Sequence, residues 1–205
     1  MVVASIVRWE ACPEAAAYRG HEAIGRHHVT IGRIERTEDD DIREALHEFP
    51  YGIYVIGTTR DGHPNAMIAD WVMQASFSPR LLAVGFERDS SSLARVRDHG
   101  AFTVNLLNQA GNGMALARGF VQPADASKVK GRSEGAAAQQ HDKLAGIDYQ
   151  LSERAPGCPI LDDALAYAEC AAEQFIEAGD HVLVLGRVLY AEVLNSGEPL
   201  TSTFT

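Results

Sequence analysis

The close spacing of the β-rich segments restricts the fold of this chain more than any other feature. We expect strands at 51–59, 64–71, 81–86, 101–107, 164–176 and 181–194, and a further strand at 29–34. Successive βαβ units would need a crossover of a dozen or more residues between neighbouring strands, and several of these connections are shorter. The spacing therefore favours a mainly β, antiparallel barrel with peripheral short helices over a doubly wound parallel sheet.

Turn and helix signals agree with this arrangement. Asp61-Gly62 is typical of a hairpin turn, and residues 177–180 join the two long strands near the end of the chain. A helix is expected from Thr37, which forms a capping box with Asp40, to Pro50. Further helices are expected at 90–99 and 109–120, with a long polar loop at 121–143. We therefore divide the chain into an N-terminal arm, 1–36, and a barrel domain, 37–205.

The charge of the chain argues against nucleic acid as a partner. The formal net charge is −10, and no stripe of Lys and Arg stands out. Binding to a double helix needs clustered cations to neutralise phosphates, so we expect no nucleic acid partner.

Cysteine, histidine and hydropathy patterns indicate a cytoplasmic protein without a metal site. Cys12, Cys158 and Cys170 are odd in number and widely spaced, which is not a disulfide or zinc framework. His21, His27 and His28 have no ligand spacing relative to these cysteines, so no metal is expected. We find no signal peptide and no apolar run long enough to span a membrane, and expect neither secretion nor membrane insertion.

A serine-rich helix start is the strongest local sign of a ligand. Ser90, Ser91 and Ser92 follow Asp89 directly before the helix expected at 90–99, and Arg88 lies just upstream. Hydroxyls and the free N–H groups of a helix N-terminus suit a phosphate. The alternative is that these serines only cap the helix.

Two further segments can serve a ligand or only the fold. Small residues at 67–71 and 75–79, including Ala69, Ala75 and Ser76, let a flat ring approach the backbone, although a strand and a turn explain them equally well. His181 follows Gly179-Asp180 where a turn enters a strand, and is either structural or a substrate contact at a barrel mouth.

Other catalytic patterns are missing or unsuitable. Asp162 and Asp163 are adjacent, and neighbours in a strand point to opposite faces, so they are poor acid/base partners. No GxGxxG opens a helix after a strand and no GxSxG occurs, which argues against a Rossmann cofactor site and a hydrolase nucleophile.

Seven segments taken in order resemble the flavin reductase-like family of FMN-binding split barrels. They are 52–59, 67–71, 75–79, 100–107, 142–147, 157–161 and 178–181, the last ending in the Gly-Asp-His marker. The resemblance covers roughly residues 42 to 195. It implies a split β-barrel of antiparallel, Greek-key type, and a homodimer with one flavin per subunit near the dimer interface.

The resemblance also assigns site residues. It implies that Ala69, Asp70, Trp71, Ala75 and Ser76 lie along the isoalloxazine and ribityl, and that Arg88, Ser90, Ser91 and Ser92 hold the phosphate. Asn105, in the strand at 101–107, is a further expected cofactor contact, and His181 is expected near the flavin or the nicotinamide as the catalytic residue.

Asp70 and Trp71 depart from the family, which has Asn and Ser at these positions. An anionic Asp70 beside the ring disfavours a negatively charged reduced flavin and lowers its potential. Trp71 is expected either to stack on the flavin or to block the nicotinamide.

The resemblance implies an NAD(P)H-dependent flavin reductase that supplies reduced flavin to a partner monooxygenase or a metal acceptor. FMN is the expected flavin, with FAD as an alternative, and the donor is NADH or NADPH. One alternative is a flavin-binding electron carrier or sensor without reductase activity. Another is a barrel that has lost the flavin and serves as an interaction module.

Overall fold

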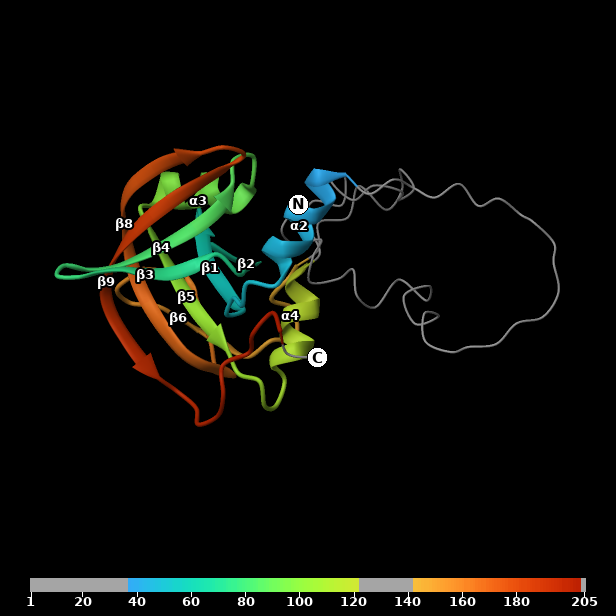
Figure 1. Cartoon of the computed structure of the whole chain (residues 1–205). Helices are drawn as coiled ribbons and strands as arrows, with labels where there is room; N and C mark the ends of the chain where they lie inside the picture. The colour runs from blue at the N-terminus through green and yellow to red at the C-terminus, as the bar shows by residue number, and fades with distance from the viewer. Residues whose placement is uncertain (1–36, 122–141, 204–205) are drawn as a thin grey trace, which may run out of the picture. The chain divides into compact units, whose positions relative to one another are not determined.

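The computed structural model describes residues 37–121 and 142–203, in two units divided after Pro50 (Figure 1). In the first unit it describes helix α2 (Glu38–His47), whose capping box is the predicted one: Thr37 Oγ accepts from the amide of Asp40, and the Asp40 carboxylate accepts from the amide of Thr37. The expected arm 1–36, the strand at 29–34, Cys12 and the three N-terminal histidines lie outside the described residues.

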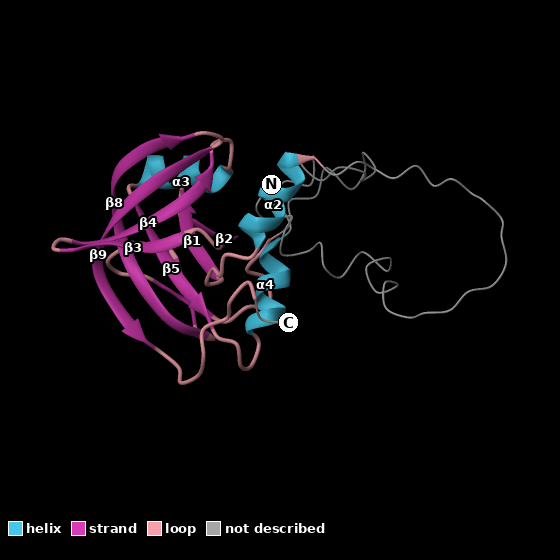
Figure 2. Cartoon of the chain, viewed as in Figure 1, coloured by secondary structure: helices cyan, strands magenta, loops and turns pink. Residues whose placement is uncertain are grey.

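The second unit, which begins at Tyr51, is a seven-stranded antiparallel sheet curled into a barrel (Figure 2). The strands follow the order β2-β1-β5-β8-β9-β4-β3, and every neighbouring pair is antiparallel. Their bounds are β1 Tyr54–Arg60, β2 His63–Ala69, β3 Val72–Phe77, β4 Arg80–Glu87, β5 Ala101–Leu107, β8 Ala164–Ala178 and β9 His181–Val193. The predicted mainly β, antiparallel split barrel is confirmed.

The split in the barrel lies between β2 and β3. These strands are the two edges of the sheet order, yet they are consecutive in the chain and joined only by Asp70 and Trp71. The amide of Val72 donates to the carbonyl of Asp70 over 3.0 Å, and the amide of Gly85 donates to the carbonyl of Trp71 over 2.8 Å. The Asp70–Trp71 corner therefore passes the chain from one edge to the other and is tied to β4.

Short helices and a small second sheet complete the unit. Helix α3 (Ser91–His99) connects β4 to β5 and packs at one end of the barrel, and it ends at Gly100, whose φ of 76° favours glycine (Figure 2). Helix α4 (Gly113–Val121) starts four residues after the predicted start at 109. Strands β6 (Tyr149–Leu151) and β7 (Pro159–Leu161) pair with each other.

Three strands were not predicted. Strand β3 is an edge strand with largely exposed residues, and β6 and β7 have three residues each, so none shows the apolar pattern of a buried strand. Asp162 and Asp163 lie in the turn between β7 and β8, directly before the strand expected at 164–176, so the opposite-face geometry of strand neighbours does not apply to them.

The core of the barrel is apolar and aromatic. Phe86 and Phe102 are fully buried, with ring centroids 6.4 Å apart in an edge-to-face arrangement. Cys158 and Cys170 are buried free thiols, and burial raises the pKa of each to about 12. Both are therefore neutral and act as small apolar side chains.

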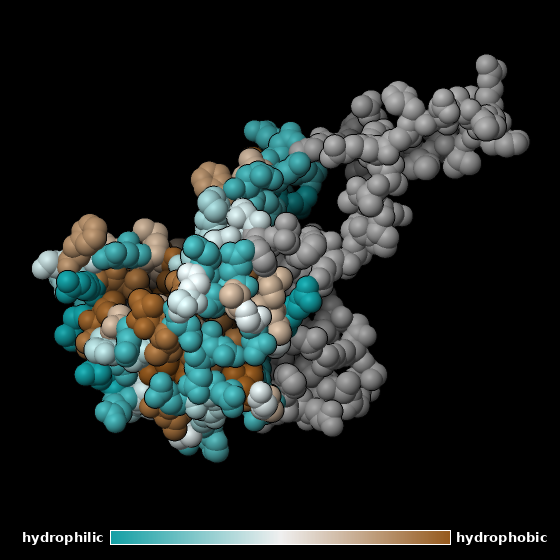
Figure 3. All heavy atoms as spheres, turned by 90° about the horizontal axis from the view of Figure 1, so that it is seen from below, coloured by the Kyte–Doolittle hydropathy of each residue, from teal (hydrophilic) through white to brown (hydrophobic). Residues whose placement is uncertain are grey.

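The surface of the unit is mixed. Seen from below, it shows apolar residues interspersed with hydrophilic ones (Figure 3). Large exposed apolar side chains lie on the edge strand β3 and on the second half of β9; they are Met73, Phe77, Leu189 and Val193. No helix of the described ranges is long and apolar enough to cross a membrane.

Candidate functional site

Trp71 and His181 form an aromatic pair beside the split of the barrel. Their ring centroids are 4.5 Å apart, with the planes tilted by 47°. The indole of Trp71 also lies against Gly85 of β4, where an added Cβ would be 3.1 Å from both Cβ and Cε3 of Trp71. The structure thus brings together the end of β2, the middle of β4 and the start of β9.

Asp70 is a buried carboxyl in the same corner. Burial raises its pKa to about 6, although hydrogen bonds from the backbone amides of Asp70 and Trp71, and the charge of His181, act in the opposite direction. The carboxyl therefore changes charge close to neutral pH, next to the aromatic pair.

His181 is itself buried and held by Asp180. Its Nδ1 lies 2.7 Å from a carboxylate oxygen of Asp180, and this hydrogen bond is the main reason why the pKa of Asp180 is lowered. An ionised Asp180 can only accept, so Nδ1 is the ring nitrogen that donates to it.

The serine-rich start of α3 adjoins this histidine. The amide of Arg88 donates to the carbonyl of Asp180 over 3.1 Å, and β4 pairs with β9 as far as Glu87 and His181. Two residues after Arg88, Ser90 caps α3 by accepting from the amide of Leu93, as its N-cap reading predicted. The phosphate-type helix start and the aromatic pair therefore lie at the same end of the barrel.

The three serines differ in exposure and use. Ser90 is engaged as the cap, Ser92 is buried, and Ser91 is exposed. The first turn of α3 contains no acidic residue, which keeps its N–H groups suited to an anion.

Arg88 already has partners. Its guanidinium donates to the carbonyl of Gly179 over 2.5 Å and lies 3.1 Å from the carboxylate of Glu177. Glu177 also faces Arg97 at 3.4 Å. Two guanidinium groups thus share one carboxylate, so this group of three side chains keeps a net positive charge.

Two predicted contacts lie away from this corner. Ser76 pairs with Leu81 of β4, four residues before Gly85, which is about 13 Å along the strand. Ala75 lies at the irregularity in β3 between Gln74 and Ser76 and is exposed. Ala69, in contrast, is buried at the end of β2, directly before the corner.

Asn105 has a different task from the expected cofactor contact. Its side chain is fully buried, its Nδ2 donates to the carbonyl of Val55 over 3.0 Å, and its Oδ1 accepts from the amide of Leu161 over 2.9 Å. These bonds join β1, β5 and β7, so we leave Asn105 out of the site proposed below.

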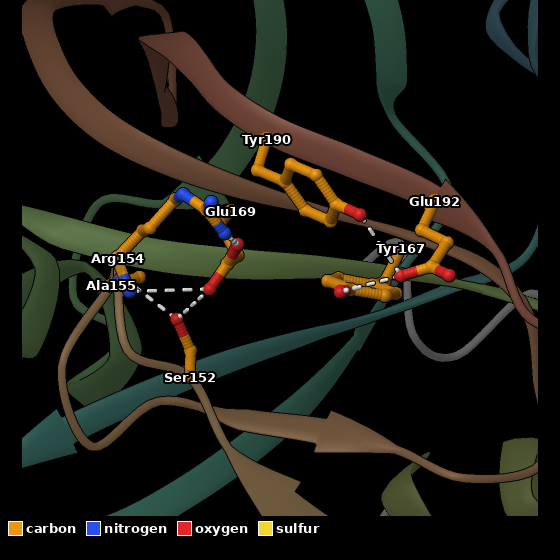
Figure 4. Close-up of polar contacts among 7 residues, drawn as sticks. All are labelled: Ser152, Arg154, Ala155, Tyr167, Glu169, Tyr190 and Glu192. Carbon is orange, nitrogen blue, oxygen red and sulfur yellow. Dashed lines mark hydrogen bonds and ion pairs between the residues drawn. The ribbon is translucent and has the colours of Figure 1, made fainter.

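A second polar cluster joins the segment between β6 and β7 to β8 and β9 (Figure 4). The buried carboxylate of Glu169 accepts from Ser152 Oγ at 2.6 Å and from the backbone amide of Arg154 at 3.2 Å, and pairs with the Arg154 guanidinium at 3.3 Å. That guanidinium lies 4.3 Å from the ring centroid of Tyr190. These contacts anchor the turn that precedes β7 onto β8, and we assign them to the fold.

Sequence reasoning missed Gly85 and Glu177. A glycine inside an apolar strand signals a close approach, and Gly85 stands between Val84 and Phe86. No local signal marks Glu177, because its partners Arg88 and Arg97 are about 80 to 90 positions away in sequence.

The corner and the start of α3 place two kinds of binding group at the same end of the barrel. The Trp71 indole and the buried imidazole suit stacking, and the serine-rich helix start with the Arg88 guanidinium suits an anion. Within residues 37–121 and 142–203, no three His, Cys, Asp or Glu side chains converge as a metal ion would need.

Comparisons with known proteins agree with this reading. The family model described as "Flavin reductase like domain" matches residues 46–203. The chain is 32% identical over 183 residues to diflavin flavoprotein A 1 of Synechocystis, covering 87% of this chain and 29% of that protein. It spans less than a third of the length of the diflavin flavoproteins that it matches first.

Solved structures share the fold. Nitrilotriacetate monooxygenase component B from Mycobacterium thermoresistibile superposes with a TM-score of 0.66 and 25% identity, covering 80% of this chain and 82% of that one. The NADH:FAD oxidoreductase of Streptomyces globisporus, in complex with NAD and FAD fragments, gives 0.65 and 27%, covering 80% and 87%.

Proposed function

Because the chain belongs to the flavin reductase-like family, we propose that it binds FMN at the Asp70–Trp71 corner and helix α3, and passes hydride from NAD(P)H to that flavin. One observation carries the proposal. The hydrogen bond from the amide of Arg88 to the carbonyl of Asp180 holds the phosphate-type helix start next to the Trp71–His181 pair.

The phosphate end of the proposed site is the start of α3. The exposed Ser91 hydroxyl and the N–H groups of the first helical turn donate to the phosphate, and Arg88 adds charge from the preceding turn. Ser90 supports this end indirectly, since it caps the helix. FAD carries the same FMN unit, so FAD remains the alternative ligand.

In the proposed site, the isoalloxazine ring lies at the Asp70–Trp71 corner. When bound, the flavin accepts hydride in the reaction NAD(P)H + H⁺ + oxidised flavin → NAD(P)⁺ + reduced flavin. The protein supplies positioning and polarisation: Asp180 fixes the orientation of the His181 imidazole, and Trp71 offers an aromatic face. Asp70, when ionised, disfavours negative charge on the ring.

A second function is favoured by the burial of His181. Only 6% of His181 is exposed, and the Trp71 indole lies on it, which obstructs a nicotinamide ring at this point. A flavin that exchanges electrons with another protein needs no nicotinamide ring stacked beside it. The alternative is therefore an FMN-binding electron carrier or sensor.

The proposed partners follow from the similar proteins. Nitrilotriacetate monooxygenase component B is by its name one part of a monooxygenase, so we propose that this chain passes reduced flavin to a separate monooxygenase. We also propose that the chain forms a homodimer, in which the second subunit covers the exposed apolar side chains of β3 and β9.

The test is steady-state oxidation of NADH and NADPH by the purified protein with added FMN or FAD. A reductase oxidises at least one nicotinamide with a rate that saturates in flavin. If FMN binds but neither nicotinamide is oxidised, the carrier or sensor is the correct function.

A further inference from the structure

Trp71 covers His181 in this structure. Trp71 is 38% exposed, whereas His181 is 6% exposed, and the two ring centroids are 4.5 Å apart. Any molecule that stacks beside His181 must therefore take the place that the indole now holds.

Gly85 holds Trp71 through two contacts. The amide of Gly85 donates to the carbonyl of Trp71, and the Trp71 side chain lies so close to Gly85 that an added Cβ would be 3.1 Å away. The absence of a side chain at Gly85 thus leaves room for the indole next to β4.

We propose that Trp71 is a gate that determines whether a nicotinamide ring reaches the flavin beside His181. The inference rests on the proposed function. Hydride transfer requires the reacting atoms to be about 3–3.5 Å apart. The nicotinamide ring therefore cannot react while the Trp71 indole occupies the position beside the flavin that this ring needs. A small side chain at position 71 opens the site to the nicotinamide.

Two variants open the gate by removing the indole, Trp71→Ser and Trp71→Ala. Trp71→Phe retains an aromatic cover, and Leu151→Ser is a control at an exposed apolar residue of β6, which lies outside the seven-stranded sheet. Circular dichroism and melting temperature establish that each variant is folded.

The first readout needs neither flavin nor turnover. Diethylpyrocarbonate modifies accessible imidazoles, and peptide mass spectrometry separates His181 from the other seven histidines. We expect His181 to be modified several-fold faster in the Trp71→Ser and Trp71→Ala variants than in the wild type, and at the wild-type rate in Trp71→Phe and Leu151→Ser. Modification at the wild-type rate in both opened variants overturns the inference.

The second readout is nicotinamide oxidation with FMN added, together with the Kd for FMN. We expect kcat/KM for the nicotinamide to rise by about tenfold in the two opened variants. If the wild type oxidises nicotinamide and the opened variants are no faster, the proposal that Trp71 is a gate is wrong and the proposed function stands. If His181 becomes accessible and FMN binds, yet no variant oxidises nicotinamide, both the reductase function and the gate proposal are wrong.

Discussion

Arg88 and Glu177 lie 3.1 Å apart where β4 leads into α3, and Arg97 approaches the same carboxylate at 3.4 Å. The guanidinium assigned to the flavin phosphate therefore already has an anionic partner. A phosphate at the start of α3 competes with Glu177 for Arg88, and this competition gives the first prediction.

Glu177→Gln is expected to tighten binding of FMN several-fold, because Arg88 loses its competing carboxylate. Arg88→Gln is expected to weaken it by about tenfold. Riboflavin lacks the phosphate, so its Kd is the internal control and should change little in either variant. Equal effects on FMN and riboflavin, measured by fluorescence titration, would show that Arg88 does not contact the phosphate.

The serines of α3 are expected to separate into a structural and a ligand role. Ser90→Ala removes the N-cap bond to the amide of Leu93 and should lower the free energy of unfolding by about 1 kcal/mol. Ser91→Ala removes an exposed hydroxyl, and should weaken FMN binding while the unfolding free energy stays within about 0.5 kcal/mol. Denaturant unfolding and FMN titration of both variants decide this, and a Ser91→Ala variant with wild-type affinity contradicts the assignment.

Asp70 is expected to make stability depend on pH. Its pKa is raised to about 6 in the folded protein from the ordinary value of 3.8, so the folded state holds the proton more tightly than the unfolded state. The stabilisation by this proton is present at low pH and is lost as pH rises toward and through about 6.

Asp70→Asn removes the titrating carboxyl, and with it the loss of folding stability as the pH rises. We expect the variant to gain stability relative to the wild type by about 1 kcal/mol when the pH is raised from about 5 to about 7.5. Urea unfolding of both proteins at the two pH values measures this. A difference between the proteins that does not change with pH contradicts the raised pKa.

Glu169 is expected to matter for folding and not for the flavin site. Glu169→Gln breaks the pair with Arg154 and weakens the bonds to Ser152 Oγ and the Arg154 amide, and should lower the unfolding free energy by roughly 1–3 kcal/mol. FMN affinity measured at a temperature where the variant is folded should stay at the wild-type value. A selective loss of FMN binding would place this cluster in the site.

Elements with a strong local pattern were predictable from sequence. The capping box of Thr37 and Asp40 and the strands on either side of Gly179-Asp180 were all expected near their observed bounds. Strand β3 was not, because an exposed edge strand needs no apolar alternation, and its pairing with β4 is a tertiary effect.

The site was predictable only in part. The capping role of Ser90 follows from local chemistry. The contact of Trp71 with His181 does not, since it joins residues 110 positions apart through the pairing of β4 with β9. Asn105 is expected from the resemblance to contact the cofactor, and the structure shows that its amide also joins three strands.

The reductase function is tested most directly by the visible absorption spectrum of the protein with bound FMN, recorded under anaerobic conditions before and after addition of NADH and of NADPH. We expect a perturbed flavin spectrum on binding, which bleaches with at least one nicotinamide. A bound flavin whose spectrum persists with both nicotinamides, but bleaches with dithionite, would contradict the reductase function.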